Sequence, residues 1–410
     1  MANFINKITQ KTAHSKRNIL LNGKNLIVVG NNGAGKTLFL RALQNYLIKI
    51  FREQQYFDIE SIETSLHNQR TALKQLEPDT NNYNNYLDTI NYYEGLLADK
   101  IAFNVTFFSS TSLLQGIKKG EIIFRFFEAG RIYNSDGNNL LTSIESLYES
   151  FKNNDANSQI ASSYFESYLV SMSNYALLEK GAEQLEEYNR VNDVINKIQS
   201  DLRNLFEDES LKLFFNRKKL RMEVIQKNKE PFSLSHLPSG YSSILAIYAE
   251  LIMLTELSNK NKDEVKGIVI IDEIDAHLHV TLQKKVFNFL SESFNGIQFI
   301  ISTHSPFVIQ SVSNAIIYNL SSNERMEDLS IYSYSSIIKG LLGETTNSND
   351  LEKLLSELNI LGENNNYNDR FGEIISILEK EIDFLSPKAK AIFLGAKSKF
   401  IDWKEEQQNV

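Results

Sequence analysis

The sequence contains no cysteine, no long apolar run and fewer basic than acidic residues. The missing thiols exclude disulfide bonds and thiolate metal sites and are typical of a reducing compartment, so we expect a cytoplasmic protein. No apolar run approaches the ~20 residues that a membrane-spanning helix needs, and we expect no membrane contact. The basic residues near the N-terminus are followed by no apolar core, which argues against a signal peptide.

The charge balance limits the classes of partner. Lysine and arginine together number 43 against 51 aspartate and glutamate residues, which gives a formal net charge of −8. An acidic balance argues against a surface that binds nucleic acid broadly, although a local basic patch is compatible with it. With 410 residues, 42% of them hydrophobic, the chain is long enough for two or three globular domains.

A glycine-rich stretch behind an apolar run is the most informative motif. Residues 26–29 are typical of a buried strand, and residues 38–43 have apolar side chains at helical spacing. Between them lies a G-x-x-x-x-G-K-[ST] motif, formed by Gly30, Asn31, Asn32, Gly33, Ala34, Gly35, Lys36 and Thr37. A strand, a glycine-rich turn and a helix in this order predict a phosphate-binding loop.

The residue types of this loop suit a nucleotide and its metal. The glycines allow the backbone N–H groups to point at phosphate oxygens, and the helix that follows adds its positive dipole end. Lys36 would contact the β- and γ-phosphates, and Thr37 would offer its hydroxyl to Mg²⁺. We therefore predict ATP and Mg²⁺ as cofactors.

Polar side chains follow two other apolar runs. Residues 267–271 read as a strand buried on both faces, and Asp272 and Glu273 come directly after it. Asp272 is placed to hold Mg²⁺, and Glu273 to polarise the attacking water. Residues 297–302 form a similar strand, and His304 behind it could donate a hydrogen bond to the γ-phosphate.

A fourth segment is informative through its position in the chain. Ser239 and Gly240 precede a helix that we expect from about Ile244, and a helix amino terminus is suited to bind an anion. His277 and His279 invite a metal-site interpretation, but their spacing and the missing third ligand argue against zinc.

The remaining segments are predicted more coarsely. Residues 52–100 favour a pair of antiparallel helices, which is either a plain surface excursion or a docking arm for a partner. The strands at 101–108 and 121–127 belong either to an antiparallel lobe or to the main sheet. Further predictions are strands at 3–10, 17–21 and 315–320, a strand hairpin at 210–216 and 219–225, and helices at 36–51, 140–206, 351–361, 371–385 and 387–404.

The order of these motifs resembles the ATPase heads of the ABC class, in the non-transporter branch of the SMC, RecF and OLD type (AAA_15 and AAA_21). The sequence is similar to the ATPases of anti-phage systems such as Septu, retrons and PARIS. The resemblance rests on Leu237 to Leu245, on Ile271 to His279 and on Ser302 to Ile309. It implies an α/β P-loop fold with an antiparallel β lobe and a helical insertion.

The resemblance also implies a mechanism. Two heads would enclose ATP between them as a homodimer or a larger even-numbered oligomer. Lys36, Glu273 and His304 would act in hydrolysis, Thr37 and Asp272 would hold the metal, and Ser239 and Gly240 would complete the site of the second protomer. Asp275 and His277 would lie at the interface of the pair. The expected output is control of a separate effector, a nuclease, in an anti-phage complex.

The predicted domain division follows the same resemblance. It comprises a head from 1–51 and 230–320, a helical hairpin at 52–100, a β lobe with a helical insertion at 101–229 and a helical region at 321–410.

Two departures from the family pattern leave alternatives open. Pro238 stands where the family's signature loop has serine, and the glutamine loop is either at Gln115 or within 127–131. A non-hydrolysing, ATP-locked scaffold is therefore one alternative. A DNA-repair ATPase that binds DNA directly is the other alternative. The basic face predicted for residues 387–404 belongs either to a solvated or partner-docking helix or to a nucleic-acid contact.

Overall fold

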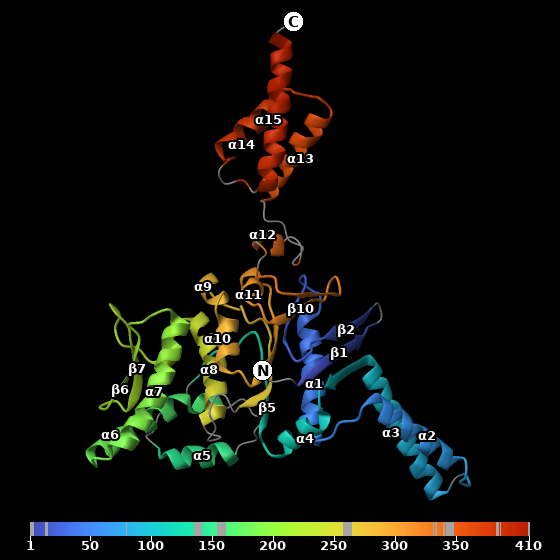
Figure 1. Cartoon of the computed structure of the whole chain (residues 1–410), viewed down its shortest axis with the longest axis vertical. Helices are drawn as coiled ribbons and strands as arrows, with labels where there is room; N and C mark the ends of the chain where they lie inside the picture. Colours follow the sequence, from blue (N-terminus) through green and yellow to red (C-terminus); the bar gives the residue numbers. More distant parts are fainter. Residues whose placement is uncertain are drawn as a thin grey trace. The chain divides into compact units, whose positions relative to one another are not determined.

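The structure is a computed structural model. It describes residues 4–12, 15–78, 80–134, 142–153, 161–256, 265–330, 332, 334–338, 341, 348–382, 385 and 387–408. The chain forms two compact units, Met1–Ile337 and Ile338–Val410; Figure 1 colours the chain in sequence order and labels many of its elements. In the described part of the chain, no helix combines the length and apolar character that a bilayer span requires.

The main sheet of the first unit has the strand order β11-β10-β3-β9-β8-β5. Its neighbouring strands run parallel, except for the antiparallel edge strand β11. Their near-continuous apolar runs suit strands that are covered on both faces. The bounds are β3 Asn25–Val29, β5 Ile122–Phe127, β8 Lys266–Ile271, β9 Ile297–Ser302, β10 Ala315–Asn319 and β11 Glu324–Glu327.

A second, antiparallel sheet has the order β2-β1-β4, with β1 Ile5–Lys11, β2 Lys16–Leu20 and β4 Phe103–Phe107. The buried amide of Gln298 on β9 joins the two sheets. It accepts from the Ile5 N–H at 2.8 Å and donates to the Lys24 carbonyl at 2.8 Å. Of the two strands that the sequence left open, the first belongs to this lobe and the second, β5, to the main sheet. Together with the phosphate-loop strand, these sheets confirm the predicted α/β fold class with its antiparallel lobe.

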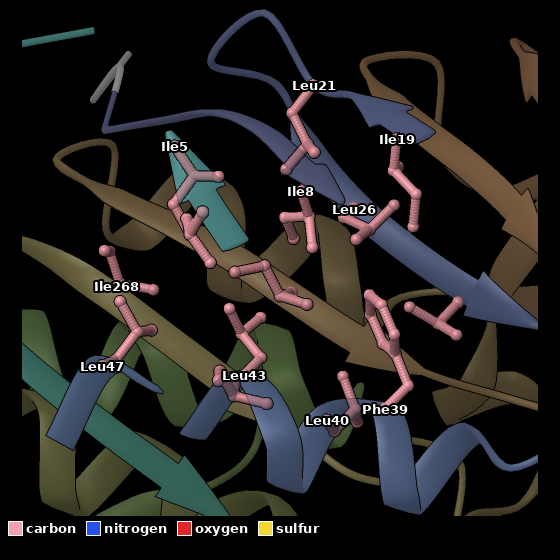
Figure 2. Close-up of a cluster of buried hydrophobic side chains, with 14 of the residues drawn as sticks. Ile5, Ile8, Ile19, Leu21, Leu26, Phe39, Leu40, Leu43, Leu47 and Ile268 are labelled. Carbon is pink, nitrogen blue, oxygen red and sulfur yellow. The ribbon is translucent and has the colours of Figure 1, made fainter. Parts of the chain in front are cut away.

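Helix α1 (Lys36–Glu53) supplies much of the core of the first unit. Phe39, Leu40, Leu43 and Leu47 are fully buried and share one cluster with residues of both sheets, among them Ile268 of β8 (Figure 2). Burying one such side chain contributes about 1.5–3 kcal/mol to stability, so these four side chains hold the helix after the phosphate loop against the sheets.

The predicted helical pair is present as α2 (Ile59–Leu73) and α3 (Asn81–Ala102). The side chain of Asp58 caps α2 and that of Thr80 caps α3, which satisfies amides of both first turns. Ile62, Leu66 and Ile90 form a small apolar core between the helices. The hairpin therefore has packing of its own and does not depend on the main core alone.

Lys100 fastens this hairpin to the rest of the unit. Its Nζ donates to the Tyr46 hydroxyl at 2.6 Å and lies 4.8 and 4.5 Å from the ring centroids of Tyr46 and Tyr56. The Tyr56 hydroxyl in turn donates to the Val105 carbonyl at 3.1 Å. Burial lowers the pKa of Lys100 to about 8.

Helix α4 (Ser110–Lys118) lies between β4 and β5, and the helical insertion follows β5 and precedes the second half of the main sheet. Part of the predicted helical stretch 140–206 lies outside the described residues, and the described part has the expected helices. The elements are α5 Ile144–Asn153, a 3₁₀ turn at Ala161–Tyr164, α6 Phe165–Gly181, α7 Leu185–Phe206, β6 Lys212–Asn216 and β7 Arg221–Ile225.

Helix α8 (Ser239–Glu256) is buried over nearly all of its surface. Glu250 on α8 accepts from Arg125 Nε of β5 at 2.9 Å and from the Ser162 N–H at 2.7 Å. Because both side chains of the Arg125–Glu250 pair are almost fully buried, removing either one would leave an uncompensated charge. Short elements complete the first unit: a 3₁₀ turn at Leu234–His236, α9 Val280–Gln283, α10 Val286–Ser293, α11 Pro306–Gln310 and α12 Tyr334–Ile337.

The second unit contains α13 (Asn349–Glu363), α14 (Asp369–Lys380) and α15 (Pro387–Gln408) around a separate apolar core. The predicted end of α14 at residue 385 is wrong, because the chain turns after Lys380 and α15 begins with a proline, which suits a first helical turn. Of the basic residues on α15, Lys397 pairs with Glu379 at 2.5 Å and Lys404 lies over the Phe400 ring.

The pH dependence of stability tests the role of Lys100. Its pKa is about 8 in the folded chain and 10.5 without burial, so the unfolded chain binds more protons between these values. Stability should therefore rise with pH from about 8 to 10, and Lys100→Met should remove this part of the rise. Urea unfolding across this range measures it, with the exposed Lys118→Met as control. Identical slopes in wild type and Lys100→Met would refute this account.

Candidate functional site

The site lies at one edge of the main sheet. In a parallel sheet the carboxyl ends of neighbouring strands meet at the same edge, and ligands bind there. Strand β9 pairs with β3 on one side and with β8 on the other. The segments that follow these three strands begin at Gly30, Asp272 and Thr303, so the structure brings together the motifs that the sequence separates widely.

The loop after β3 has the backbone geometry that its glycines were predicted to permit. Gly30, Gly33 and Gly35 have φ values of 147°, 81° and 86°, which side-chain-bearing residues rarely adopt. The Asn31 N–H donates to Ser321 Oγ at 3.0 Å, which ties the loop to the end of β10. No side chain caps the amino terminus of α1 at Gly35, so its first amides are available to an anion.

Lys36 lies inside this loop and is 7% exposed. Its Nζ donates to the Gly30 carbonyl at 2.9 Å and to the Asn31 carbonyl at 3.2 Å. Burial lowers the pKa of Lys36, and the carboxylates of Glu273, Asp272 and Asp275 oppose this effect. The amine therefore lies within electrostatic reach of the acidic residues after β8. Thr37, the second residue of α1, is exposed at the open end of the helix.

A single serine orders the acidic pair after β8. Ser302 Oγ donates to Asp272 Oδ1 at 2.5 Å and accepts from the Glu273 N–H at 2.8 Å. Asp272 is 5% exposed, whereas Glu273 is half-buried with a left-handed φ of 45°. One carboxylate is thus fixed in the interior, and the other lies at the rim of the site.

His304 is half-buried two residues beyond β9. Its neighbour Thr303 donates from Oγ1 to Asp275 Oδ1 at 2.5 Å and accepts from the Ser305 N–H at 2.9 Å. These bonds connect the segment that carries His304 to the loop after β8. They also give Asp275, which the sequence assigned to an interface, a contact within its own chain.

Ser239 and Gly240 lie at the start of α8, beside the loop after β8. The predicted helix start near Ile244 is wrong, because the Ser242 N–H already donates to the Pro238 carbonyl at 2.9 Å. Gly240 is buried, and a Cβ at this position would lie 2.8 Å from the His277 carbonyl oxygen. Ser239 is exposed. Among the described contacts, these two residues have no hydrogen bond to the phosphate loop.

The structure distinguishes the two positions that the sequence offered for the glutamine loop. Gln115 is exposed on α4, ahead of β5 and therefore near the opposite edge of the sheet, so it is not at the site. The other stretch considered, residues 127–131, does lie at the site, and its Arg131 donates to the Asp272 carbonyl at 2.9 Å. Sequence reasoning missed Ser302 and Ser321 as site residues. The signal that could have found them is their position at the ends of β9 and β10.

The comparisons with known proteins agree with this geometry. A family model described as "AAA domain, putative AbiEii toxin, Type IV TA system" (AAA_21) matches residues 26–310. The chain belongs to this family. The match covers the phosphate loop, the acidic pair and His304, and it confirms the branch predicted from the sequence.

Individual relatives are similar over shorter stretches. The chain is 35% identical over 107 residues to "Retron Ec83 probable ATPase" of Escherichia coli, which covers 25% of this chain and 20% of that protein. It is 29% identical over 201 residues to "Septu protein PtuA" of Bacillus mycoides (strain KBAB4), covering 47% and 28%. The matched stretches span less than a third of these relatives' length. The predicted resemblance to retron and Septu ATPases is confirmed.

Among solved structures, an Smc head bound to the C-terminal winged-helix domain of ScpA is similar with a TM-score of 0.33 and 14% identity, covering 77% of this chain and 93% of that chain. The fold class rests on the sheet order and the family match.

Removing the charge of Lys36 tests the phosphate loop. Lys36→Met should weaken binding of magnesium ATP by about 10- to 150-fold, because a hydrogen bond to a charged group contributes ~1.5–3 kcal/mol. A fluorescent ATP analogue measures this affinity. Lys49→Met, on the exposed face of the same helix, is the control. Equal affinities of the two variants would contradict the assignment.

Proposed function

We propose that this protein binds and hydrolyses ATP with Mg²⁺ and that it does so as a pair of heads. The single observation that carries the proposal is that parallel pairing of β3, β9 and β8 brings Lys36, Asp272 and Glu273 to one edge of the sheet, next to an uncapped helix amino terminus. The site residues fit the cofactor. The positive-φ glycines leave room for phosphate oxygens, and the buried, serine-held Asp272 offers an oxygen ligand of the kind that Mg²⁺ prefers.

In the proposed reaction each residue has one task. The amides of residues 30–37 and the amine of Lys36 bind the triphosphate, while Thr37 and Asp272 hold the metal. Glu273 accepts a hydrogen bond from the attacking water, and His304 orients the γ-phosphate. Bound Mg²⁺ would supply charge neutralisation on the phosphate oxygens. The protein contributes positioning and electrostatics without a covalent intermediate.

Exposed side chains around the site support pairing of the heads. Leu38, directly after Thr37, is 76% exposed, and Ile132, directly after Arg131, is 64% exposed. Between their segments, Arg41 and Glu128 form an ion pair at 2.9 Å. A second head that covered the Leu38 and Ile132 side chains would remove their apolar surface from water, which is favourable. The exposed Ser239 is available to a second copy in the same way.

The biological output extends this proposal. Because the similar proteins carry retron and Septu names, we infer that the paired heads control a separate effector, a nuclease, in an anti-phage complex. The α2–α3 hairpin and the helices of residues 338–410 are the surfaces proposed for docking it. The division into a head (1–51 and 230–320), a hairpin (52–100), an insertion (101–229) and a helical region (321–410) remains part of the proposal.

Replacing the proposed water-polarising residue tests hydrolysis. Glu273→Gln should lower the steady-state rate of phosphate release by about 10²-fold or more while ATP binding persists, because the amide cannot accept the proton. The exposed Glu63→Gln on α2 is the control. If wild type and Glu273→Gln release phosphate at the same near-zero rate and both bind ATP, the protein is the non-hydrolysing scaffold instead.

Mixing two inactive variants tests pairing. Lys36→Met damages a site from within, and Ser239→Arg would damage the site of the partner. When the two are co-expressed and co-purified, about a quarter of the wild-type rate should return, because half of the randomly formed pairs contain one intact site of two.

The control for this experiment is Ser235→Arg, an exposed serine on the same segment. Full activity of Ser239→Arg alone, or no recovery in the mixed pair, would overturn the proposed contribution of Ser239 to a second site.

A further inference from the structure

The Arg131 guanidinium makes an unusual set of contacts at the site. Nη1 donates to the carbonyls of Glu128 and Asp272, each at 2.9 Å. Nη2 donates to the carbonyls of Glu273 at 3.2 Å and Ile274 at 3.1 Å. One buried side chain thus binds three consecutive carbonyls in the segment that carries both proposed catalytic carboxylates.

That segment needs to be held. Glu273 has a left-handed φ of 45°, a conformation that costs energy for a residue with a Cβ and persists only where its surroundings enforce it. Ser302 binds it from one side, since Ser302 Oγ accepts from the Glu273 N–H and the Ser302 carbonyl accepts from the Ile274 N–H at 3.0 Å. Arg131 binds the carbonyls of the same two peptide units, those of Asp272 and Glu273. The segment is therefore held by hydrogen bonds to both its N–H groups and its carbonyls.

The electrostatics favour an arginine over a neutral donor. Burial lowers the pKa of Arg131 to about 10, while the carboxylates of Asp275, Asp272 and Glu273 oppose this effect. The side chain therefore remains cationic at neutral pH and interacts favourably with these three carboxylates. Its planar fork can serve several acceptors at fixed angles, which the point charge of a lysine cannot reproduce.

The chain just beyond Arg131 leads to another part of the site. The Tyr133 N–H donates to Ser242 Oγ at 3.1 Å, in the first turn of α8. The buried Tyr133 ring also packs edge-on against Phe165, which packs in the same way against Tyr248 of α8. Residues 131–133 therefore connect the backbone of Glu273 to the helix that begins with Ser239.

We propose that Arg131 is a positioning residue that fixes the direction of the Glu273 carboxylate through the backbone of residues 272–274. The inference rests on the proposed function, because positioning matters only if Glu273 polarises water. It assigns to the segment after β5 a task in catalysis that the phosphate loop and the acidic pair do not perform. It also accounts for a buried cation whose bonds go to carbonyl oxygens.

The first test does not require nucleotide. Amide hydrogen exchange of the free protein should be faster for peptides covering residues 270–278 in Arg131→Gln than in wild type, and unchanged in α1. Arg203→Gln is the matched control, since Arg203 Nε donates to the Leu211 carbonyl at 2.7 Å in the insertion. Unchanged exchange at 270–278 would overturn the inference, whether or not the protein hydrolyses ATP.

The second test separates positioning from a structural role. Arg131→Gln should lower kcat by about 10²-fold with KM for magnesium ATP changed by less than about threefold, as expected when a reacting group is displaced slightly. Arg131→Lys keeps the charge, and its kcat should lie between those of wild type and Arg131→Gln. If Arg131→Gln does not fold, Arg131→Lys takes its place in the test. Arg203→Gln should leave both constants unchanged.

The outcomes distinguish the two proposals. If Glu273→Gln abolishes turnover but Arg131→Gln keeps the wild-type kcat, the positioning role fails and the proposed function stands. If kcat and KM of Arg131→Gln deteriorate together with thermal stability, Arg131 is a structural residue and the inference is wrong. If the wild type neither binds nor hydrolyses ATP, the proposed function fails, and positioning for hydrolysis fails with it even where exchange changes.

Discussion

The parallel pairing of β9 with both β3 and β8 is the constraint on which the site depends. It aligns the ends of strands whose sequences lie far apart, so that the phosphate loop, the acidic pair and His304 share one edge. Two hydrogen bonds join the end of β9 directly to the ends of its neighbours. Ser302 Oγ binds Asp272, and the Thr303 N–H donates to the Val28 carbonyl at 3.2 Å. A shift of β9 by one residue would move every one of these groups, because strand register fixes which side chains face which layer.

The rest of the first unit supports this edge. Helix α1 is buried against both sheets, so the loop in front of it cannot move without disturbing the core. Helix α8 is buried on almost all sides, and the buried Arg125–Glu250 pair joins it to β5. These contacts fix the position of Ser239 at the start of the helix. The α2–α3 hairpin is attached to the rest of the unit through Lys100 and two tyrosines.

Much of the fold could be predicted because its signals are local. Apolar runs of β-branched residues predicted β3, β8 and β9, and the glycines at 30, 33 and 35 predicted a loop with positive φ values. The helical pair at 52–100 followed from periodicity and a turn. Predictions of element ends were weaker. The start of α8 depends on a bond to the Pro238 carbonyl, and the end of α14 on where the chain turns, neither of which a hydrophobic pattern encodes.

The sequence by itself determined the motifs of the candidate site: a phosphate-binding loop, an acidic pair and a histidine, each at the end of an apolar strand, because these signals are carried by neighbours along the chain. Only the tertiary structure decided which distant residues serve them. Arg131, Ser302 and Ser321 are ordinary in sequence, and they matter because strand pairing brings their side chains to backbone groups far away in the chain. Such contacts follow from register and packing, which no local pattern specifies.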